Sequence, residues 1–512
     1  MVYKIGSRKS LLAKTQSEQI KILLESQTTS SFEMVFITTK GDQDQHTPLW
    51  QMEINNIFTR ELDHALTDKK TDLNIHSFKD LGLQRPPELT IGALTKRSFP
   101  HDILLIKNQT IKDLFNNKLP TLKIGTSSPR RTCNINRHLK NLLSYQGALN
   151  VSSLRGNVNS RIEKLQNGEF DCIILALAGL ERLAMNPNAH QQLTLLLKDL
   201  NFLILPISLF PGAAGQGTLA VEIRQSSQEQ LLPILASIHD PASALEVTKE
   251  REAFTQYGGG CHLPVGIFVK KFEDNFIHCH QGFHQNQEIN ILKLDLKRKR
   301  PMNSPYVFIG QTRVGQTPPF INRQIIYNNL LSFQTILCTS RLDNNVVITS
   351  SNVLSAINFE KFDPTTLWTS GLHTMQTMFK RKYWVNGTGD FLGEEGLIAF
   401  KNSLFVNIFL KDFAWSYLTN DESKSTLGPS IPTYTRIKNS LSTEYLEQIE
   451  KTQIFYWMSF YQYEAYLKIF PGIAAKCHCC GIGKTYKRFK ERNIPAIPFI
   501  NLNEFYQWLD EK

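Results

Sequence analysis

The sequence predicts an α/β protein with several lobes, and three observations support this fold class. The chain has 512 residues, and at about 150 residues per domain this length corresponds to roughly three to five domains. Over the first 300 residues, short β-branched strands alternate with helical stretches. The same alternation restarts near residue 305, after a stretch with four Pro and two Gly at 301–320. Such alternation is typical of sheets covered by helices.

The first unit begins with a strand at 3–8, an amphipathic helix at 11–24 and a strand at 33–42 that ends in a turn. A helix at 57–67 precedes a strand that runs into a loop at 72–80. This βαβ order predicts a largely parallel sheet with helices on both of its faces.

A second unit repeats this form. Strands that turn into helices are expected at 122–131 and 150–165, and residues 170–183 supply a central strand and a helix. The apolar run Cys172–Leu180 has the composition of a buried strand, and it is far shorter than the roughly 18 residues that span a bilayer. Residues 201–217 are rich in Pro and Gly, so we expect a hinge or a return crossing there.

Three further regions complete the expected organisation. Residues 226–300 contain one helix, a Gly-rich loop and short strands, which predicts a small α+β domain. Residues 301–320 are a linker with the first strand of the next region, and residues 321–512 are α/β again, with two lobes. The first lobe is expected at 1–98, with a return segment at 206–225. The second lobe is expected at 99–205.

The formal charge of +11 and the pI near 9.1 raise the question of a nucleic-acid partner. The sequence has no basic tail and no groove-reading motif, and its one dense basic run, Lys297–Arg300, is typical of a solvated surface. The N-terminus lacks the apolar segment of a secretory signal, and eight Cys are too sparse for a disulfide framework. We therefore expect a cytoplasmic monomer that binds neither nucleic acid nor membrane.

Asp80 is the first candidate for chemistry, because it follows His76, Ser77 and Lys79 just past the end of a buried strand. The carboxyl ends of strands line the ligand crevice of an open α/β sheet. A carboxylate there could stabilise a cation or transfer protons. A surface turn with a local Lys–Asp pair is the alternative explanation.

Arginines and hydroxyl residues recur where helices are expected to begin. Backbone N–H groups at a helix start combine with guanidinium groups to form anion sites. Two such sites in the second unit and one in the first imply a ligand with several carboxylates or phosphates, although any single arginine could be a surface residue of its helix. The residues are Ser127, Ser128, Arg130, Arg131, Arg155 and Arg161, with Arg8 and Ser10 in the first unit.

Cys261 lies in a loop in which three glycines precede it and a Pro follows. Such a loop is mobile or is approached closely by another group. A thiolate there could act as a nucleophile or as a covalent anchor, assisted by His262. An inert small apolar side chain is the alternative.

Three other motifs support no site. The sequence GIGKT at 481–485 lacks the Gly that a phosphate loop needs at position 478, where His stands. The Cys-His runs at 477–480 and 278–284 have no second half at the spacing of a zinc finger. We therefore predict no metal site.

Residues 1–300 contain, in this order, IGSRKSLLAKTQ, TTKGDQDQHTPL, IHSFKDLG, IGTSSPRR, SLRGNVNSR, FPGAAGQGTLAVEIR and GGGCHLPVG. With these motifs the chain resembles porphobilinogen deaminase, also called hydroxymethylbilane synthase. The resemblance implies two periplasmic-binding-protein-like lobes around a cleft, and a small α+β domain that carries the cofactor loop. It also implies the reaction, in which four porphobilinogen molecules are joined with loss of ammonia and released as hydroxymethylbilane.

By this resemblance, Cys261 holds a dipyrromethane cofactor through a thioether, and Asp80 is the catalytic carboxylate. Its charge stabilises the cation left when porphobilinogen loses ammonia. Cofactor binding is implied for Lys79, Ser127, Ser128, Arg130, Arg131 and Arg155, and substrate binding for Arg8, Ser10, Arg161 and Arg182. The family's cleft loop Gly-Gly-Lys-Gly-Leu-Phe is replaced here by EINNIF at 53–58, which removes its glycines and one anion contact.

Residues 305–512 are similar to uroporphyrinogen-III synthase through VITSSNVL, TSGLHT, IPTYTR, YWMSFYQYEAYL and CGIGKTYKRF. That resemblance implies two α/β lobes joined by a two-stranded connector, and cyclisation of hydroxymethylbilane to uroporphyrinogen III. Tyr434 corresponds to a proposed proton donor, and the corresponding cleft residues are Ser350, Thr374, Ser459 and Thr485. The stretch 313–349 is shorter than in that family, so we expect part of the first lobe to be missing.

Three functions are consistent with these features. The leading hypothesis is a bifunctional enzyme of haem biosynthesis whose partners are porphobilinogen and the linear tetrapyrrole. The second is a deaminase with a non-catalytic C-terminal docking module. The third is a ligand-binding protein of periplasmic type, which gives no reason for Asp80 together with Cys261.

Overall fold

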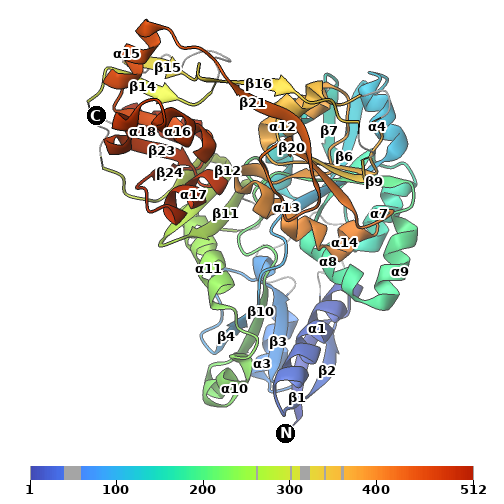
Figure 1. Ribbon diagram of the computed structural model, residues 1–512. Coiled ribbons are helices and arrows are strands. Elements are labelled where there is room, and N and C mark those ends of the chain that lie inside the picture. Colours follow the sequence, from blue (N-terminus) through green and yellow to red (C-terminus); the bar gives the residue numbers. More distant parts are fainter. Residues whose placement is uncertain are drawn as a thin grey trace.

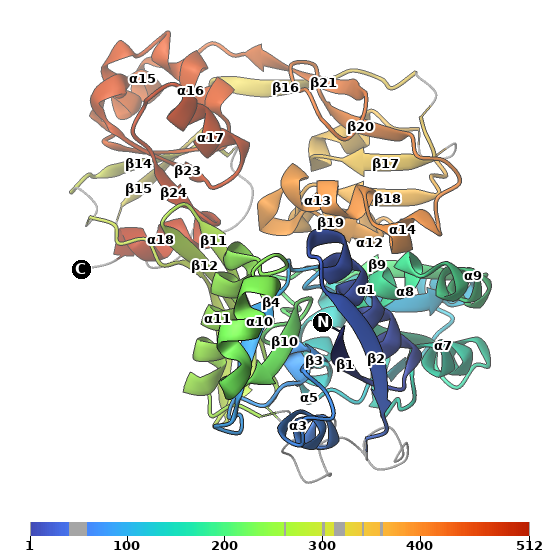
Figure 2. The ribbon, with the colours of Figure 1, turned by 90° about the horizontal axis from the view of Figure 1, so that it is seen from below.

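The computed structural model describes residues 2–39, 59–260, 263–299, 303–311, 323–339, 342–358 and 362–510. Cys261, His262 and the cleft loop expected at 53–58 lie outside the described residues. Figures 1 and 2 show a first lobe at the N-terminus, a second lobe beside it, a small domain, and a C-terminal half with two lobes of its own. Within the described ranges, no helix has the length and apolar character needed to cross a membrane.

The first lobe is built on a five-stranded sheet in the order β2-β1-β3-β10-β4. Its strands are β1 (Val2–Arg8), β2 (Ser31–Ile37), β3 (Leu73–Ser77), β4 (Leu89–Leu94) and β10 (Leu219–Arg224). The helices packed on it are α1 (Leu11–Gln27), α3 (Arg60–Thr67) and α10 (Gln228–Leu235).

Four of the five strands run in the same direction, so the sheet is largely parallel as expected, with one reversed strand. Strand β10 runs antiparallel to both β3 and β4. The chain leaves the sheet at the C-terminal end of β4 and returns from the second lobe to that same end of the strands. Strand β10, which enters the sheet there between β3 and β4, therefore runs in the opposite direction.

The second lobe is built on a five-stranded sheet in the order β7-β6-β8-β5-β9. Its strands are β5 (Asp102–Lys107), β6 (Thr121–Gly125), β7 (Ala148–Ser152), β8 (Cys172–Ala176) and β9 (Leu200–Ile204). Its α-helices are α4 (Asn108–Phe115), α5 (Pro129–Asn134), α6 (Lys140–Leu143), α7 (Val158–Gln166), α8 (Leu177–Met185) and α9 (Pro187–Leu196).

Two expectations for this lobe are corrected by the structure. The run Cys172–Leu180 is not one strand, because β8 ends at Ala176 and α8 begins at the next residue. The region 201–217 is not wholly a crossing, because its first residues belong to β9, which pairs antiparallel with β5. The apolar side chains of β9 make it a strand, since Phe202 and Ile204 join a core that the C-terminal half completes.

The small domain is a three-stranded antiparallel sheet with one helix against it. Its elements are α11 (Pro241–Gln256), β11 (Val265–Phe272), β12 (Asn275–His284) and β13 (Gln287–Leu294).

Two helices, α10 and α11, lie between residues 226 and 300, so the expectation of one helix is wrong. They are separate because Asp240 caps a new helix that begins at Pro241. Leu231 and Leu235 of α10 pack into the core of the first lobe. The start of the small domain at residue 226, as expected from the sequence, stays a prediction.

One lobe of the C-terminal half has a parallel sheet in the order β15-β14-β22-β23-β24. Its strands are β14 (Tyr306–Ile309), β15 (Gln324–Tyr327), β22 (Ile454–Trp457), β23 (Cys477–Gly481) and β24 (Ile497–Phe499). Its helices are α15 (Thr443–Lys451), α16 (Phe460–Leu467), α17 (Lys484–Glu491) and α18 (Leu502–Asp510).

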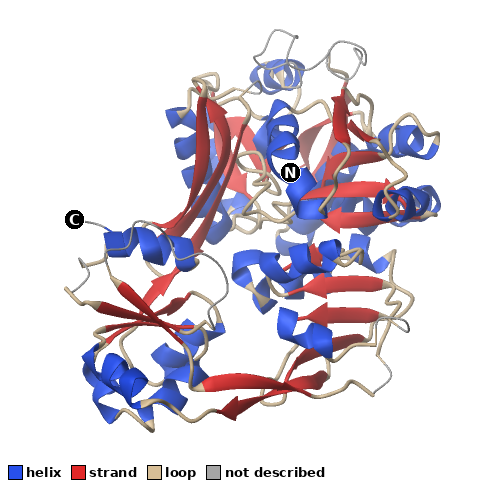
Figure 3. Cartoon of the chain, turned by 90° about the horizontal axis from the view of Figure 1, so that it is seen from above, coloured by secondary structure: helices blue, strands red, loops and turns tan. Residues whose placement is uncertain are grey.

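The other lobe has a six-stranded sheet in the order β16-β21-β20-β17-β18-β19. Its strands are β16 (Leu331–Thr335), β17 (Asn345–Ile348), β18 (Thr366–Thr369), β19 (Gly387–Thr388), β20 (Trp415–Asn420) and β21 (Ser430–Lys438). Its α-helices are α12 (Leu372–Lys380), α13 (Glu394–Lys401) and α14 (Leu404–Asn407). The antiparallel strands β16 and β21 bridge the two lobes, which is the two-stranded connector expected from the sequence (Figures 2 and 3).

The C-terminal half shares a hydrophobic core with the second lobe. Phe202 of β9 lies 6.0 Å, between ring centroids, from Trp368 of β18. The backbone N–H of Ile204 donates to the carbonyl oxygen of Asn386 at 2.8 Å. The two sheets therefore meet at the β9 and β19 edges, where side chains of both halves exclude water.

Candidate active site

A cavity of about 1910 Å³ is lined by both lobes and by α11 of the small domain. Asp80 of the first lobe and a group of arginines of the second lobe line it. Its lining includes Arg8 and Ser10, together with Lys79, Asp80, Ser127, Ser128, Arg130, Arg131, Arg155, Arg161 and Arg182. The structure thus brings into one cleft all the candidate site residues of the N-terminal half that lie within its described ranges.

Asp80 ends a short 3-10 turn, Phe78–Asp80, that follows β3 directly. The backbone N–H of Phe78 donates to the carbonyl oxygen of Thr218 at 3.0 Å, which ties the turn to the chain returning from the second lobe. Phe78 is buried whereas Asp80 is exposed, so the apolar residue anchors the turn and the carboxylate is presented to the cleft.

Arg251 holds the Asp80 turn from outside the first lobe, and sequence reasoning missed it. From α11, its guanidinium donates to the carbonyl oxygens of Phe78 (3.0 Å), Leu81 (3.0 Å) and Gly82 (2.7 Å). Its Cζ atom also lies 4.5 Å from the centroid of the Phe78 ring. No local sequence signal could reveal this role, because Arg251 and its partners are about 170 positions apart in the chain.

Lys79 lies beside Asp80, and its ammonium donates to Gln216 Oε1 at 3.2 Å. Burial in the cleft lowers the pKa of Lys79 to about 8, and the neighbouring Asp80 charge opposes this shift. The side chain is therefore a cation near neutral pH that titrates in the mildly alkaline range.

Arg130 and Arg131 share one buried carboxylate, which the sequence did not single out. Asp102, the first residue of β5, accepts from Arg130 Nη1 and from Arg131 Nη2, both at 2.7 Å. Burial alone would raise the pKa of Asp102, but the two guanidinium groups hold it well below its ordinary value. Arg131 Nε is buried and has no hydrogen-bond partner among the described residues, so a donor remains for a ligand.

The serines at the helix start organise the loops around these arginines. Ser128 caps α5, and its hydroxyl accepts from the N–H of Arg131 at 3.4 Å. The Ser127 hydroxyl donates to the carbonyl oxygen of Leu154 at 2.7 Å and accepts from the Leu154 N–H at 3.0 Å. Ser127 thereby holds the loop that carries Arg155 beside α5.

The remaining arginines are held by backbone carbonyls. Arg161 Nε donates to Gly156 O at 2.8 Å, and Arg182 Nη2 donates to Gly217 O at 2.6 Å. Burial lowers the pKa of both guanidinium groups to about 10, and for Arg161 the nearby Arg131 charge adds to this effect. Both therefore stay cationic at neutral pH. Desolvation of the buried charges costs free energy, and an anionic ligand would offset this cost.

The three glycines before Cys261 meet a backbone requirement. Gly258, Gly259 and Gly260 have φ angles of 90°, 65° and 106°, values that other residues adopt at an energetic cost. A Cβ atom on Gly259 would lie 2.3 Å from Leu83 Cδ1. Gly260 and Leu263, which flank the undescribed pair, both line the cleft.

The C-terminal candidates are divided between the two C-terminal lobes. Ser350 and Ser459 each follow a strand and cap the helical turn after it, through Asn352 N–H (3.2 Å) and Gln462 N–H (3.3 Å). The Thr485 hydroxyl donates to Met458 O at 3.4 Å, and Thr374 is buried in the first turn of α12. Tyr434 of β21 is buried, with its ring 5.4 Å from that of Phe333.

Two ion pairs that sequence reasoning missed join these lobes. Lys484 of α17 pairs with Glu394 of α13, and Lys487 pairs with Glu395. Glu394 also accepts from the N–H of Thr426 at 2.9 Å. The lobes are therefore in contact through the N-terminal ends of α13 and α17.

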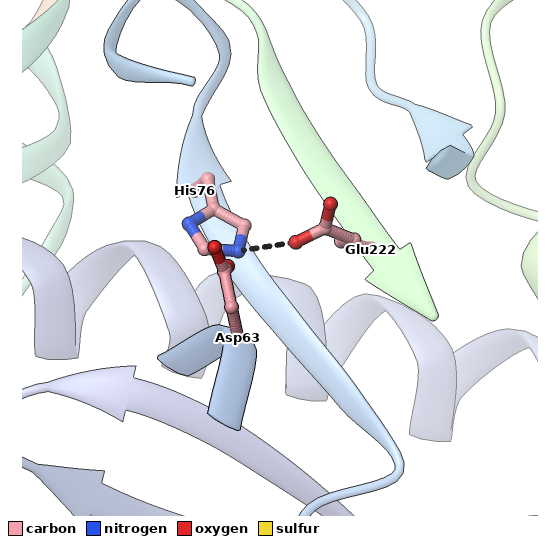
Figure 4. A group of neighbouring side chains, drawn as sticks. All are labelled: Asp63, His76 and Glu222. Atoms are coloured by element: carbon pink, nitrogen blue, oxygen red, sulfur yellow. Dashed lines mark ion pairs between the residues drawn. The ribbon is translucent and has the colours of Figure 1, made fainter. Parts of the chain in front are cut away.

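A second titratable cluster lies inside the first lobe (Figure 4). Asp63 of α3, His76 of β3 and Glu222 of β10 converge there, with ligand atoms within 4.8 Å of one another. His76 Nε2 lies 3.3 Å from Glu222 Oε2, and the Arg85 guanidinium donates to Glu222 at 2.8 Å and to Asp63 at 2.5 Å. Because the guanidinium already supplies the cation between the two carboxylates, the cluster is better explained as a structural ion network than as a metal site.

Comparison with known proteins gives the following matches. Residues 3–231 match the family model described as porphobilinogen deaminase, dipyromethane cofactor binding domain. A porphobilinogen deaminase of Brevibacillus brevis is 36% identical over 277 residues, which are 54% of this chain and 82% of the relative. That of Helicobacter hepaticus is 37% identical over 272 residues, 53% of this chain and 77% of the relative.

Among solved structures, a uroporphyrinogen-III synthetase from Helicobacter pylori is 16% identical to this chain. The match covers 38% of this chain and 92% of that chain, with a TM-score of 0.27. A TM-score of this size supports no inference about fold or activity.

Proposed function

Because the chain belongs to the porphobilinogen deaminase family, we propose that Asp80 and the cationic cleft join four porphobilinogen molecules into hydroxymethylbilane, and that the C-terminal half closes this product to uroporphyrinogen III. Family membership itself establishes porphobilinogen deaminase activity in tetrapyrrole biosynthesis and a dipyrromethane-binding domain. The observation that carries the assignment of the site is the exposed Asp80 carboxylate in a cleft lined by arginines.

The cleft fits a dipyrromethane group, whose pyrroles carry acetate and propionate side chains. The buried Arg131 Nε, with no partner among the described residues, is a donor suited to a carboxylate. We assign cofactor binding to Lys79, Ser127, Ser128, Arg130, Arg131 and Arg155, and covalent attachment to Cys261. When bound, dipyrromethane supplies the pyrrole carbon from which the chain is extended.

The remaining polar residues serve the incoming substrate. Arg8, Ser10, Arg161 and Arg182 line the same cleft and would bind the carboxylates of porphobilinogen and of the lengthening chain. Because each pyrrole carries two carboxylates, several fixed guanidinium groups are needed to hold the chain in one orientation.

Asp80 acts on the charge that develops as ammonia leaves. Loss of ammonia from porphobilinogen leaves a positive charge shared with the pyrrole N–H, and the fixed Asp80 carboxylate stabilises that charge. Two opposite charges at 4 Å interact by about 4 kcal/mol at an effective dielectric constant near 20. This energy corresponds to roughly a thousandfold in rate.

Replacement of the carboxylate tests this role. Asp80→Asn should lower kcat for porphobilinogen consumption by about a thousandfold, whereas the exposed Asp68→Asn in the same lobe should not. The covalent cofactor, measured by intact mass, should be present in both variants and absent from Cys261→Ser. An Asp80→Asn chain with ordinary turnover would contradict the assignment.

The proposal for the C-terminal half is supported by its two α/β lobes and their β16–β21 connector. Ser459 and Thr485 on one lobe, and Ser350 and Thr374 on the other, follow strands at the lobe ends, where α/β sheets bind ligands. Tyr434 lies on the connector strand β21 and is the proposed proton donor.

Chromatography of the uroporphyrin isomers formed from porphobilinogen tests cyclisation. Isomer III should dominate for the wild-type chain, and Tyr434→Phe should lower its fraction while porphobilinogen consumption is unchanged. Isomer I alone from the wild-type chain would contradict cyclisation and support a non-catalytic docking module.

A further inference from the structure

Residues 390–405 of the C-terminal half, which we call the brace, contact both crossings between the deaminase lobes. The brace comprises a short 3-10 turn (Asp390–Leu392), α13 and the start of α14. The outgoing crossing, residues 95–101, leads from β4 to β5, and the return crossing, residues 205–218, leads from β9 to β10. Figure 2 shows α13 and α14 directly above β9 and α8 of the second lobe.

The return crossing is held by Asp390. Its carboxylate accepts from the N–H of Ser208 at 2.8 Å and from the hydroxyl of Ser208 at 2.7 Å. The neighbouring Phe391 packs against Ile207 of the same crossing and against Phe268 of the small domain. Because Ser208 is buried, these charge-assisted bonds are protected from water, and they fix the crossing to the brace.

The outgoing crossing is held by Phe400. Its ring stacks on Phe99, with centroids 5.9 Å apart, and meets His101 edge-on at 4.9 Å. Directly beside Phe99, the N–H of Ser98 donates to the carbonyl oxygen of Gly217 at 3.0 Å. Phe400 therefore packs where the outgoing and return crossings lie side by side.

The brace also holds α8, the helix that carries a cleft arginine. Glu181 of α8 is buried and accepts from the Ser403 hydroxyl at 2.6 Å and from the first two N–H groups of α14 at 3.0 and 3.1 Å. The next residue, Arg182, lines the cleft and donates to the return crossing at Gly217 O. A carboxylate with three donors is a strong anchor for this helix.

We propose that the brace positions the two deaminase lobes for catalysis, so that Asp390, Phe400 and Glu181 are positioning residues for the deaminase reaction. Asp80 belongs to the first lobe and Arg131 to the second, and the crossings connect these lobes. A shift of the crossings changes the distance between the carboxylate and the guanidinium groups that hold the substrate. The proposal rests on the deaminase activity, and it does not require the C-terminal half to cyclise anything.

Substitutions in the full-length holoenzyme test the brace. The variants are Asp390→Ala, Phe400→Leu and the milder Ser208→Ala, which removes one of the two bonds to Asp390. Phe413→Leu is the matched control, because Phe413 lies in the same half and is 70% exposed. The measurement is kcat and KM for porphobilinogen consumption, per molecule that carries the covalent cofactor by intact mass, together with Tm.

A positioning role predicts a fall of about 5- to 20-fold in kcat for Asp390→Ala and Phe400→Leu, because small displacements of reacting groups are costly. Ser208→Ala should lower kcat by about two- to fivefold, and the Asp390→Ala/Ser208→Ala double variant should fall no further than Asp390→Ala alone. If the cofactor-loaded fractions of Ser208→Ala and of the other variants all had the wild-type kcat, even with a lower Tm, the proposal would be overturned. The isomer distribution plays no part in this test, so a failure of cyclisation leaves the inference intact.

Discussion

Replacing Arg251 by Met removes the clamp on the Asp80 turn and leaves a side chain of similar length against Phe78. Arg251 donates to three carbonyl oxygens of the turn and its neighbours, at 2.7 to 3.0 Å. Burial lowers the pKa of Arg251 to about 10, so the guanidinium is charged at neutral pH and the three bonds are charge-assisted.

The size of the effect follows from these bonds. A hydrogen bond to a charged group contributes about 1.5–3 kcal/mol, which for three bonds gives a gross value of about 5–9 kcal/mol. Because the turn borders the open cleft, water can hydrate the freed carbonyls, and we expect a net loss of about 2–4 kcal/mol in the stability of this region. A displacement of Asp80 by about 1 Å would lower kcat by about a hundredfold.

The assay is porphobilinogen consumption per cofactor-loaded molecule, compared with Lys249→Met on the same helix. Lys249 also lies over an aromatic ring, at 4.6 Å from the Phe276 centroid, but that ring belongs to the small domain rather than to the turn. Arg251→Lys should recover little of the activity, because one ammonium cannot reach three carbonyls in fork geometry. If Arg251→Met kept kcat within about twofold of wild type, the turn would not need its clamp and the reasoning would be wrong.

Three further perturbations test the electrostatics. Asp102→Asn leaves two buried guanidinium groups without their counter-ion, so chemical unfolding monitored by fluorescence should show a loss of about 3–5 kcal/mol. The folded-state pKa of Asp102 is depressed, so the stabilisation by its carboxylate is present above the unfolded pKa near 3.9 and is lost as the pH falls through the lower folded value. The difference in the free energy of unfolding between wild type and Asp102→Asn should therefore narrow in acid. Because the pKa of Lys79 is about 8, its ammonium discharges above that pH and holds the cofactor carboxylates less firmly, so kcat per cofactor-loaded molecule should fall there, whereas Lys79→Arg should show no such fall; an identical pH profile for both would refute the assignment. Arg85→Met should cost about 3–5 kcal/mol because it strands Asp63 and Glu222, while a chelator should leave the wild-type Tm unchanged, and a Tm that fell with chelator would point to a metal in place of the ion network.

Much of the deaminase site could be predicted from the sequence because its features are local. A strand that ends in Ser or Thr before a helix marks a cap, and Ser10 and Ser128 do cap α1 and α5. Asp80 ends the short turn that follows β3, so its place near the strand end needed no knowledge of distant residues.

Two features that the sequence did not predict are decided by distant segments, whereas the missed helix starts after Ala176 and Asp240 are set locally. The direction of β10 depends on how the chain returns from another lobe. The strand state of β9 depends on a core that the C-terminal half completes, with Phe202 against Trp368. Neither contact leaves a periodic signal near these residues.

The sequence by itself determined the α/β class, the family resemblance of residues 1–300, and the residue types that a polycarboxylate pyrrole chain requires. These depend on short-range patterns, in which side-chain period and capping act within a few residues. The tertiary structure alone decided that Asp102 neutralises Arg130 and Arg131, that Arg251 clamps the Asp80 turn, and that the brace lies on the crossings. Each of these contacts joins residues dozens to hundreds of positions apart, and burial, which makes their charges and hydrogen bonds strong, exists only once the lobes have packed.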